Sequence, residues 1–186
     1  LNKLLGSNGW LSRNVVRGQS DIVVYFSGHG IANQKDKSTG ILPFDVDPNY
    51  SVGLPLKKLY KDLNAMGAKS VTVYLDACFT GQTRDAKMLI ADARPIIILP
   101  KEQEIPDNVS VLSAASGSQI SGAIKKKEHG LFTYYVLRGL SGDADGNKDK
   151  VVKLNELSDY VSKNVREQAA LNGREQFPQL KSNQDK

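Results

Sequence analysis

The sequence predicts an α/β fold with a parallel sheet, because two apolar strands flank an amphipathic helix. Asp21–Phe26 and Val71–Leu75 are rich in β-branched and aromatic residues, which is typical of buried strands. Between them, Leu56–Met66 repeats apolar residues at helical spacing, and Gly67 follows as a helix-ending glycine. Strand, helix and strand in this order favour a parallel sheet with a right-handed crossover.

The rest of the chain is expected to add elements of the same kinds. Leu1–Ser20 is predicted to hold the end of a helix, Ile31–Gly53 a long loop, and Val109–Ala114 a third strand. Two more helices are expected, one around Phe132, Tyr135, Val136 and Leu140 and one around Leu154, Leu157, Val161 and Val165. A short strand is expected at Ile96–Leu99, although the prolines on both sides weaken this prediction. The tail at Lys181–Lys186 is expected to be frayed.

Composition favours one globular domain over other classes of protein. The 186 residues suffice for one buried core, and no run of eighteen apolar residues suggests a membrane span. The net charge of +5 comes from 25 basic and 20 acidic residues that are interspersed, so we expect no binding to nucleic acid or membranes. A lone cysteine excludes an internal disulfide and fits a reducing, cytoplasmic compartment.

Each of the two main strands runs into a residue that can carry chemistry. The first strand leads to Ser27-Gly28-His29-Gly30, and the second leads to Asp76-Ala77-Cys78. Open α/β sheets bind their ligands at the carboxyl ends of the strands, so these two segments are expected to meet there. A cysteine thiol needs a base to become a nucleophile, and His29 is the candidate base for Cys78. The alternative is that Cys78 is a small buried apolar residue.

Two motifs carry a resemblance to a known family. YFSGHG at Tyr25–Gly30 and YLDACFTG at Tyr74–Gly81 resemble the caspase-like cysteine peptidases, and more closely the metacaspase-like branch with its bacterial-type caspase domain. That branch has Asp two positions before the cysteine, and Asp76 stands here in place of the glutamine of the caspase Gln-Ala-Cys signature. His29 precedes Cys78 by 49 positions, close to the separation of about 50 that caspases are known to have. The resemblance continues in LPFDVDP (Leu42–Pro48), SAAS (Ser113–Ser116), HGLFTYYVLRGL (His129–Leu140) and QFPQ (Gln176–Gln179).

For the fold, the resemblance implies a caspase-like three-layer sandwich, with a mostly parallel central sheet and helices on both faces. It implies that residues 1–186 are one catalytic domain lacking the first strand and helix of that fold, so an upstream segment of the same protein is an expected partner. Residues 82–108 match the linker that separates the large and small subunits of related peptidases. The linker contains basic residues at which the enzyme is expected to process itself: Arg84, Lys87, Arg94 and Lys101.

For the function, the resemblance implies a cysteine endopeptidase with His29 and Cys78 as catalytic dyad and the backbone N–H groups of Gly30 and Cys78 as oxyanion hole. In the metacaspase-like branch, the residues matching Ser27 and Asp76 line a pocket for a basic P1 side chain. The expected substrate is therefore a protein or peptide cut after Arg or Lys. Asp76 has an alternative as an acceptor of loop N–H groups, and His129 is interpreted as a surface or capping residue.

Two other functions stay open. The chain is alternatively a catalytically silent caspase-like regulatory or interaction module, although such homologues usually lose the cysteine or the histidine. A caspase-type preference for aspartate at P1 is a weaker alternative, because it would need a basic P1 pocket and the sequence assigns none.

A calcium site is a further candidate, although the peptidase chemistry requires no cofactor. Asp145, Asn147, Asp149 and Glu156 match positions 1, 3, 5 and 12 of an EF-hand loop. Lys150 stands at position 6, where that loop has glycine, so a polar turn between two helices is the alternative. Metacaspases often bind calcium through a different acidic cluster. One member of that cluster matches Asp85, but Ser51–Pro55 lacks its other acids.

Overall fold

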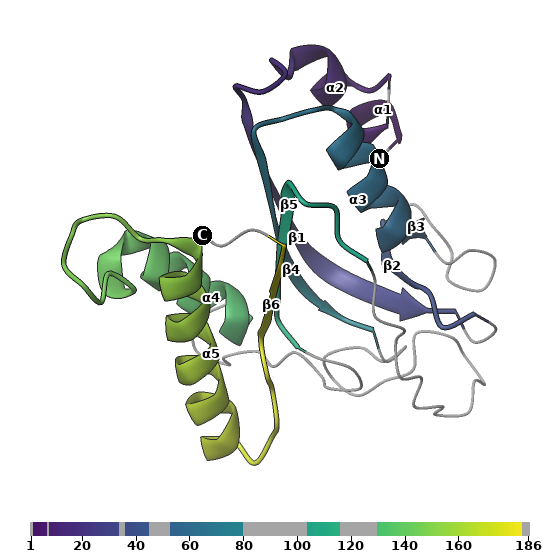
Figure 1. Cartoon of the computed structure of the whole chain (residues 1–186). Coiled ribbons are helices and arrows are strands. Elements are labelled where there is room, and N and C mark those ends of the chain that lie inside the picture. Colours follow the sequence, from purple (N-terminus) through teal and green to yellow (C-terminus); the bar gives the residue numbers. More distant parts are fainter. Residues whose placement is uncertain are drawn as a thin grey trace.

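The computed structural model describes residues 2–6, 8–33, 36–44, 53–79, 104–115 and 130–183. Within these segments, six strands form one sheet in the order β3-β2-β1-β4-β5-β6. Helices lie on both sides of the sheet, so the three layers that the resemblance implies are present (Figure 1).

Parallel strands form the middle of the sheet. β1 (Asp21–Ala32) lies parallel to β4 (Ser70–Cys78), and β4 lies parallel to β5 (Val109–Ser113). Helix α3 (Leu56–Ala65) stands between β1 and β4 in the chain, which confirms the predicted strand–helix–strand unit. Gly67 has a φ of 68°, a left-handed conformation that glycine adopts without strain after a helix.

The expectation of a mostly parallel sheet is wrong, because antiparallel strands form both edges. β2 (Thr39–Leu42) runs antiparallel to β1, and β3 (Leu54–Pro55) runs antiparallel to β2. At the other edge, β6 (Gln179–Ser182) runs antiparallel to β5. A connection as short as that between β1 and β2 can join antiparallel strands but not parallel ones. The sheet is therefore mixed.

β1 is longer than its apolar pattern predicts. The strand continues through the glycines of the Ser27–Gly30 segment as far as Ala32, where it pairs with β2. The predicted loop at Ile31–Gly53 is therefore wrong where it overlaps β1 and β2. Between these strands the Asp36 carboxylate accepts the hydroxyl of Ser38 at 2.7 Å and its backbone N–H at 2.9 Å, and these two bonds stabilise a turn. The bond from the hydroxyl, and then that from the backbone N–H, lower the pKa of Asp36.

Two apolar cores fill the spaces between the sheet and its helices. Alternate residues of a strand point to opposite faces, so β4 contributes to both cores. One core lies under α3 and the short helices α1 (Asn2–Leu5) and α2 (Trp10–Asn14), and includes Leu59, Leu63, Val71, Val73 and Val111. The other core lies under α4 (Leu131–Arg138) and α5 (Leu154–Leu171), and includes Tyr74, Leu112, Phe132, Leu157 and Val161. Each such large side chain stabilises the fold by about 1.5–3 kcal/mol when it is fully buried.

The helices differ from prediction mainly at their ends. The expected N-terminal helix consists of α1 and α2, and α4 passes into a π-helical segment, η1 (Gly139–Asp143), before the turn that leads to α5. The frayed tail is a wrong prediction for Lys181 and Ser182, because both belong to β6 and pair with β5. The predicted strand at Ile96–Leu99 lies outside the described residues, as does most of the linker.

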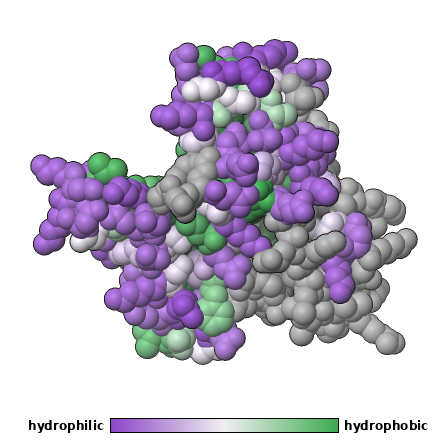
Figure 2. Space-filling model, viewed as in Figure 1, coloured by the Kyte–Doolittle hydropathy of each residue, from purple (hydrophilic) through white to green (hydrophobic). Residues whose placement is uncertain are grey.

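The surface seen in Figure 2 is mainly hydrophilic over both helical layers, with small apolar patches between polar side chains. None of the helices in the described segments is both long and apolar enough to cross a membrane.

Candidate active site

Four predicted site residues lie at the carboxyl ends of two neighbouring parallel strands. The register of β1 and β4 pairs Ser27 with Asp76 and His29 with Cys78. Paired residues project to the same face of a sheet, and adjacent strands are about 4.8 Å apart. Residues two positions apart in a strand share a face, so all four side chains project to the face that carries α4. The strand register therefore sets an imidazole beside a thiol, and a hydroxyl beside a carboxylate.

The two members of the predicted dyad differ in exposure. Cys78 is a free cysteine with 5% of its surface exposed, whereas His29 is exposed. Both strands lie inside the sheet, but on this face the β4 side chains from Tyr74 to Cys78 are buried, whereas the β1 side chains from Val23 to His29 are exposed. The imidazole is therefore accessible from solvent, and the buried thiol is its partner in the strand register.

Gly30 brings the ends of the two strands close together. A Cβ atom at this position would lie 2.6 Å from the Cys78 carbonyl oxygen and 2.6 Å from the Phe79 Cδ1 atom. Real Cβ atoms do not approach so closely, so no larger residue fits here without a backbone shift. The two residues whose N–H groups are expected to form an oxyanion hole are therefore close in space.

Asp76 is fully buried and accepts a hydrogen bond from a helix of the covering layer. The Thr133 hydroxyl in α4 donates to Asp76 Oδ2 at 2.5 Å. The Tyr25 hydroxyl in β1 lies 2.8 Å from Thr133 Oγ1. Gly130, which caps α4, packs against the same carboxylate, since a Cβ there would lie 2.2 Å from Oδ2. One partner of Asp76 is thus a side-chain hydroxyl, whereas the alternative interpretation expects loop N–H groups.

Sequence reasoning missed the contribution of Tyr25, Gly130 and Thr133 to this site. Tyr25 stands in the first motif, and Gly130 and Thr133 stand in the HGLFTYYVLRGL segment that supports the resemblance. That segment was the available signal, but it does not indicate which of its residues faces the sheet. His129, which precedes Gly130, lies outside the described residues.

A buried glutamine supports the end of β5 near the site. Gln176 is 1% exposed, and its side-chain amide donates to the Ala114 carbonyl at 2.9 Å. This bond links the loop after α5 to the residue that follows β5. The SAAS and QFPQ segments of the resemblance are therefore in contact, although more than sixty residues separate them in the chain.

The predicted calcium loop forms a compact turn between η1 and α5. The Asp145 carboxylate accepts the backbone N–H of Asp149 at 3.2 Å and that of Lys150 at 2.9 Å. The N–H of Asp149 also donates to Asn147 Oδ1 at 2.8 Å. Lys150 has a φ of 68°, the left-handed conformation that an EF-hand loop obtains from glycine. The turn thus shares with the predicted loop a left-handed backbone at position 6, here without glycine.

The carboxylates of this loop serve as turn and cap acceptors. Glu156 accepts the backbone N–H of Lys153 at 2.9 Å and caps the first turn of α5. Among the residues that the structure describes, no group of three or more His, Cys, Asp or Glu side chains is placed to hold a metal ion. Calcium binding at Asp145, Asn147, Asp149 and Glu156 stays a prediction.

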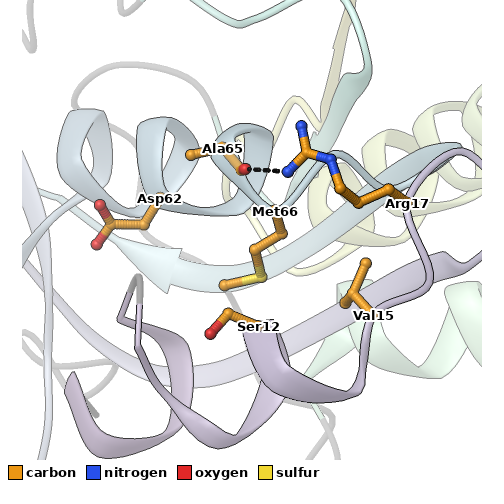
Figure 3. Close-up of a pocket in the computed structure, with 6 residues that line it drawn as sticks. All are labelled: Ser12, Val15, Arg17, Asp62, Ala65 and Met66. Carbon is orange, nitrogen blue, oxygen red and sulfur yellow. Dashed lines mark hydrogen bonds between the residues drawn. The ribbon is translucent and has the colours of Figure 1, made fainter.

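The hollow in Figure 3 is separate from the predicted site. It lies between α2 and α3, where Arg17 Nη1 donates to the Ala65 carbonyl at 3.3 Å. Both helices cover the face of the sheet opposite to the face from which Asp76 and Cys78 project. The residues that line the hollow are Ser12, Val15, Arg17, Asp62, Ala65 and Met66, and none of them is a predicted site residue.

Comparison with known proteins identifies the family. Residues 2–186 match the family model of the caspase domain. The matched residues include both strands that carry the motifs and the α4 segment. A search of curated proteins found no match to this chain. The caspase domain implies a cysteine-type peptidase that acts on proteins. Because the match covers nearly the whole sequence, the protein belongs to the caspase-domain family of cysteine peptidases.

Proposed function

We propose that the protein is a cysteine endopeptidase that cuts after Arg or Lys by means of a His29–Cys78 dyad. The observation that supports this most strongly is the register of β1 and β4. It pairs His29 with Cys78, and Ser27 with the fully buried carboxylate of Asp76, on one face of the sheet. One strand pair thus carries both the proposed dyad and the carboxylate that we propose binds a cationic side chain.

The proposed reaction is acyl transfer through a thioester. His29 takes the proton from Cys78 Sγ, and the thiolate attacks the carbonyl carbon of the scissile bond. The C–N bond breaks, and His29 returns the proton to the leaving amine. A water molecule then gives a proton to His29 and attacks the thioester. The C–S bond breaks and His29 returns the proton to Sγ, which releases the acid product and restores the thiol. The N–H groups of Gly30 and Cys78 stabilise the oxyanion in both steps.

The proposed specificity follows from the chemistry of Asp76 and Ser27. A buried carboxylate is stabilised by hydrogen-bonding and charged partners, and a guanidinium or ammonium group is among the strongest of these because its hydrogen bonds are charge-assisted. A substrate with Arg or Lys at P1 supplies that partner. An acidic P1 side chain would meet a like charge, so the aspartate preference of caspases is not expected here.

Three finer assignments are supported by the sequence only. Membership of the metacaspase-like branch and self-processing in residues 82–108 follow from the resemblance. Work in the cytoplasm, where a thiol stays reduced, follows from the single cysteine. Calcium binding is tested by calorimetric titration of the wild type and Glu156→Ala. A single binding site that the substitution weakens would support calcium binding. If millimolar calcium produces no heat, only the interpretation as a polar turn remains.

A P1-scanning peptide library tests the proposed function. We expect the wild type to cut after Arg and Lys, and Cys78→Ala to be inactive but still folded. Asp76→Ala, or Asp76→Asn if the former does not fold, should lose the basic preference. Asp62→Ala, which removes a carboxylate from α3, should retain it. A folded but inactive wild type would favour the silent regulatory module, and an unchanged profile in the Asp76 variants would assign the pocket charge to another residue.

A further inference from the structure

We infer that Thr133 and Tyr25 are positioning residues that hold the Asp76 carboxylate and thereby set the preference for a basic P1 side chain. This inference rests on the proposed specificity and extends it to two residues that the sequence motifs do not assign. The three residues come from three elements, namely β1, α4 and β4, and meet on one face of the sheet.

The hydrogen bonds of this group have a defined direction. A threonine hydroxyl carries one hydrogen, and Thr133 gives it to Asp76 Oδ2 at 2.5 Å. The contact of 2.8 Å between the hydroxyl oxygens of Tyr25 and Thr133 must therefore use the Tyr25 hydrogen. Two hydroxyl groups in series point their dipoles toward the carboxylate, and each such bond polarises the next.

Burial makes the Thr133 bond important for the pocket. Asp76 is fully buried and Thr133 is 7% exposed, so water is a poor substitute for a lost hydroxyl. Loss of a bond to a buried charged group corresponds to about a ten- to hundredfold change in an equilibrium constant. Tyr25 is 51% exposed, so loss of its hydroxyl should have a smaller effect.

The first turn of α4 also restricts the orientation of the carboxylate. Gly130 and Thr133 are three positions apart, a spacing that places residues on the same side of a helix. The backbone at Gly130 packs against Asp76 Oδ2, and Thr133 donates to that same oxygen. The backbone at Gly130 and the Thr133 hydroxyl thus act on the same oxygen and fix the orientation of the carboxyl group.

The test compares substrates that differ only in charge at P1. Peptides with Arg or with citrulline, its neutral isostere, are cut by the wild type and by Thr133→Val. We expect the Arg/citrulline ratio of kcat/KM to fall about ten- to hundredfold in the variant, mainly through KM for the Arg peptide. The kcat and the rate of Cys78 alkylation by iodoacetamide should stay within about twofold.

Matched variants separate positioning from a general structural effect. Thr133→Ser keeps the hydroxyl and should restore the ratio. Tyr25→Phe should lower it severalfold. Tyr160→Phe is the control, because it removes a tyrosine hydroxyl that donates to a different carboxylate, Asp143, at 3.2 Å. It should leave the ratio unchanged.

A ratio in Thr133→Val within twofold of the wild-type ratio would overturn the inference while leaving the proposed function intact. If Thr133→Val does not fold, Tyr25→Phe decides, and an unchanged ratio in that variant overturns the inference. A wild type that shows no preference for Arg over citrulline would instead overturn the proposed specificity, and the inference with it. The two failures are distinguishable, because the second is already visible in the wild type.

Discussion

At the scale of single residues, two glycines determine how closely the site elements approach. Gly30 lets β1 meet the end of β4 at Cys78, and Gly130 lets α4 meet the carboxylate of Asp76. Neither position needs a left-handed backbone, so each glycine is required by the close approach of its neighbours. The predicted site therefore needs a residue without a side chain at both of these positions, in addition to the four side chains that the strand register brings together.

Gly130→Ala tests this dependence. The added Cβ would lie 2.2 Å from Asp76 Oδ2, so the carboxylate or α4 must shift. We expect a loss of stability of about 1–3 kcal/mol, as for overpacking in a core, and a lower kcat/KM for Arg peptides. Thermal unfolding and steady-state kinetics measure both. Gly146→Ala is the control, since a Cβ there meets nothing within 4 Å. Equal behaviour of the two variants would contradict the predicted role of Gly130.

The placement of the candidate dyad on one face of the sheet could be predicted from sequence, but the residues that contact Asp76 could not. Both motifs follow apolar strands, and the period of two in a strand places Ser27 with His29, and Asp76 with Cys78, on one face. Thr133 lies 57 positions from Asp76 and 108 from Tyr25 in the chain. No local pattern reports which helix covers a given strand end, so these partners appear only in the folded structure.

At the scale of elements, the turn from Asp145 to Glu156 is stabilised by carboxylates rather than by packing. Asp149 is exposed and accepts the backbone N–H of Val151 at 2.8 Å, which lowers the pKa of its carboxyl group below the ordinary value. Lys153 Nζ lies 3.6 Å from the same carboxylate and adds a weak ion pair. The charged form of Asp149 is thus preferred in the folded state.

This preference predicts a pH dependence of stability. A carboxyl group with a lowered pKa stabilises the fold above its unfolded pKa, about 3.9, and loses this contribution as the pH falls through the folded pKa. Asp149→Ala should therefore lower the melting temperature at pH 7, and the difference from the wild type should narrow below about pH 4. Thermal unfolding of both proteins between pH 2 and 7 measures this difference in melting temperature. A difference that stays the same below about pH 4 would contradict the stabilising role of the charged Asp149 carboxylate.

Long elements were predictable and short edge strands were not. Strands β1 and β4 and helix α3 carry clear periodicity, so the central unit followed from the sequence. β2 has four residues and β3 has two, and both lie within a segment dominated by turn and charged residues. β6 includes Lys181 in a polar C-terminal segment. Such strands form because a neighbouring edge offers hydrogen-bond partners, and this information is not local.

At the scale of the whole molecule, the predicted site lies at the carboxyl ends of the central strands β1 and β4, on the face covered by α4 and α5. The linker that follows Cys78 is expected to be a substrate of this site. Arg84 and Lys87 are the preferred positions, because Arg94 is followed by proline, which lacks the N–H expected at P1′, and Lys101 follows another proline.

Self-cleavage after Arg84 or Lys87 is therefore predicted. Mass spectrometry of protein incubated with and without calcium should detect the two fragments, and Cys78→Ala should stay intact. A wild-type chain that remains whole would exclude self-processing in the linker. Equal cleavage of Cys78→Ala would assign the cut to a contaminating protease.

The most direct test of the whole account is the hydrolysis of an Arg-P1 peptide by His29→Ala, with His129→Ala as the matched control. Because the strand register sets His29 beside Cys78, we predict that kcat/KM falls by about 10²–10⁴-fold in His29→Ala, the range of a lost general base. The kcat/KM of the His129 variant should stay within about twofold of the wild-type value, and His29→Ala should melt like the wild type. A His29→Ala protein with wild-type kcat/KM would contradict the proposed dyad.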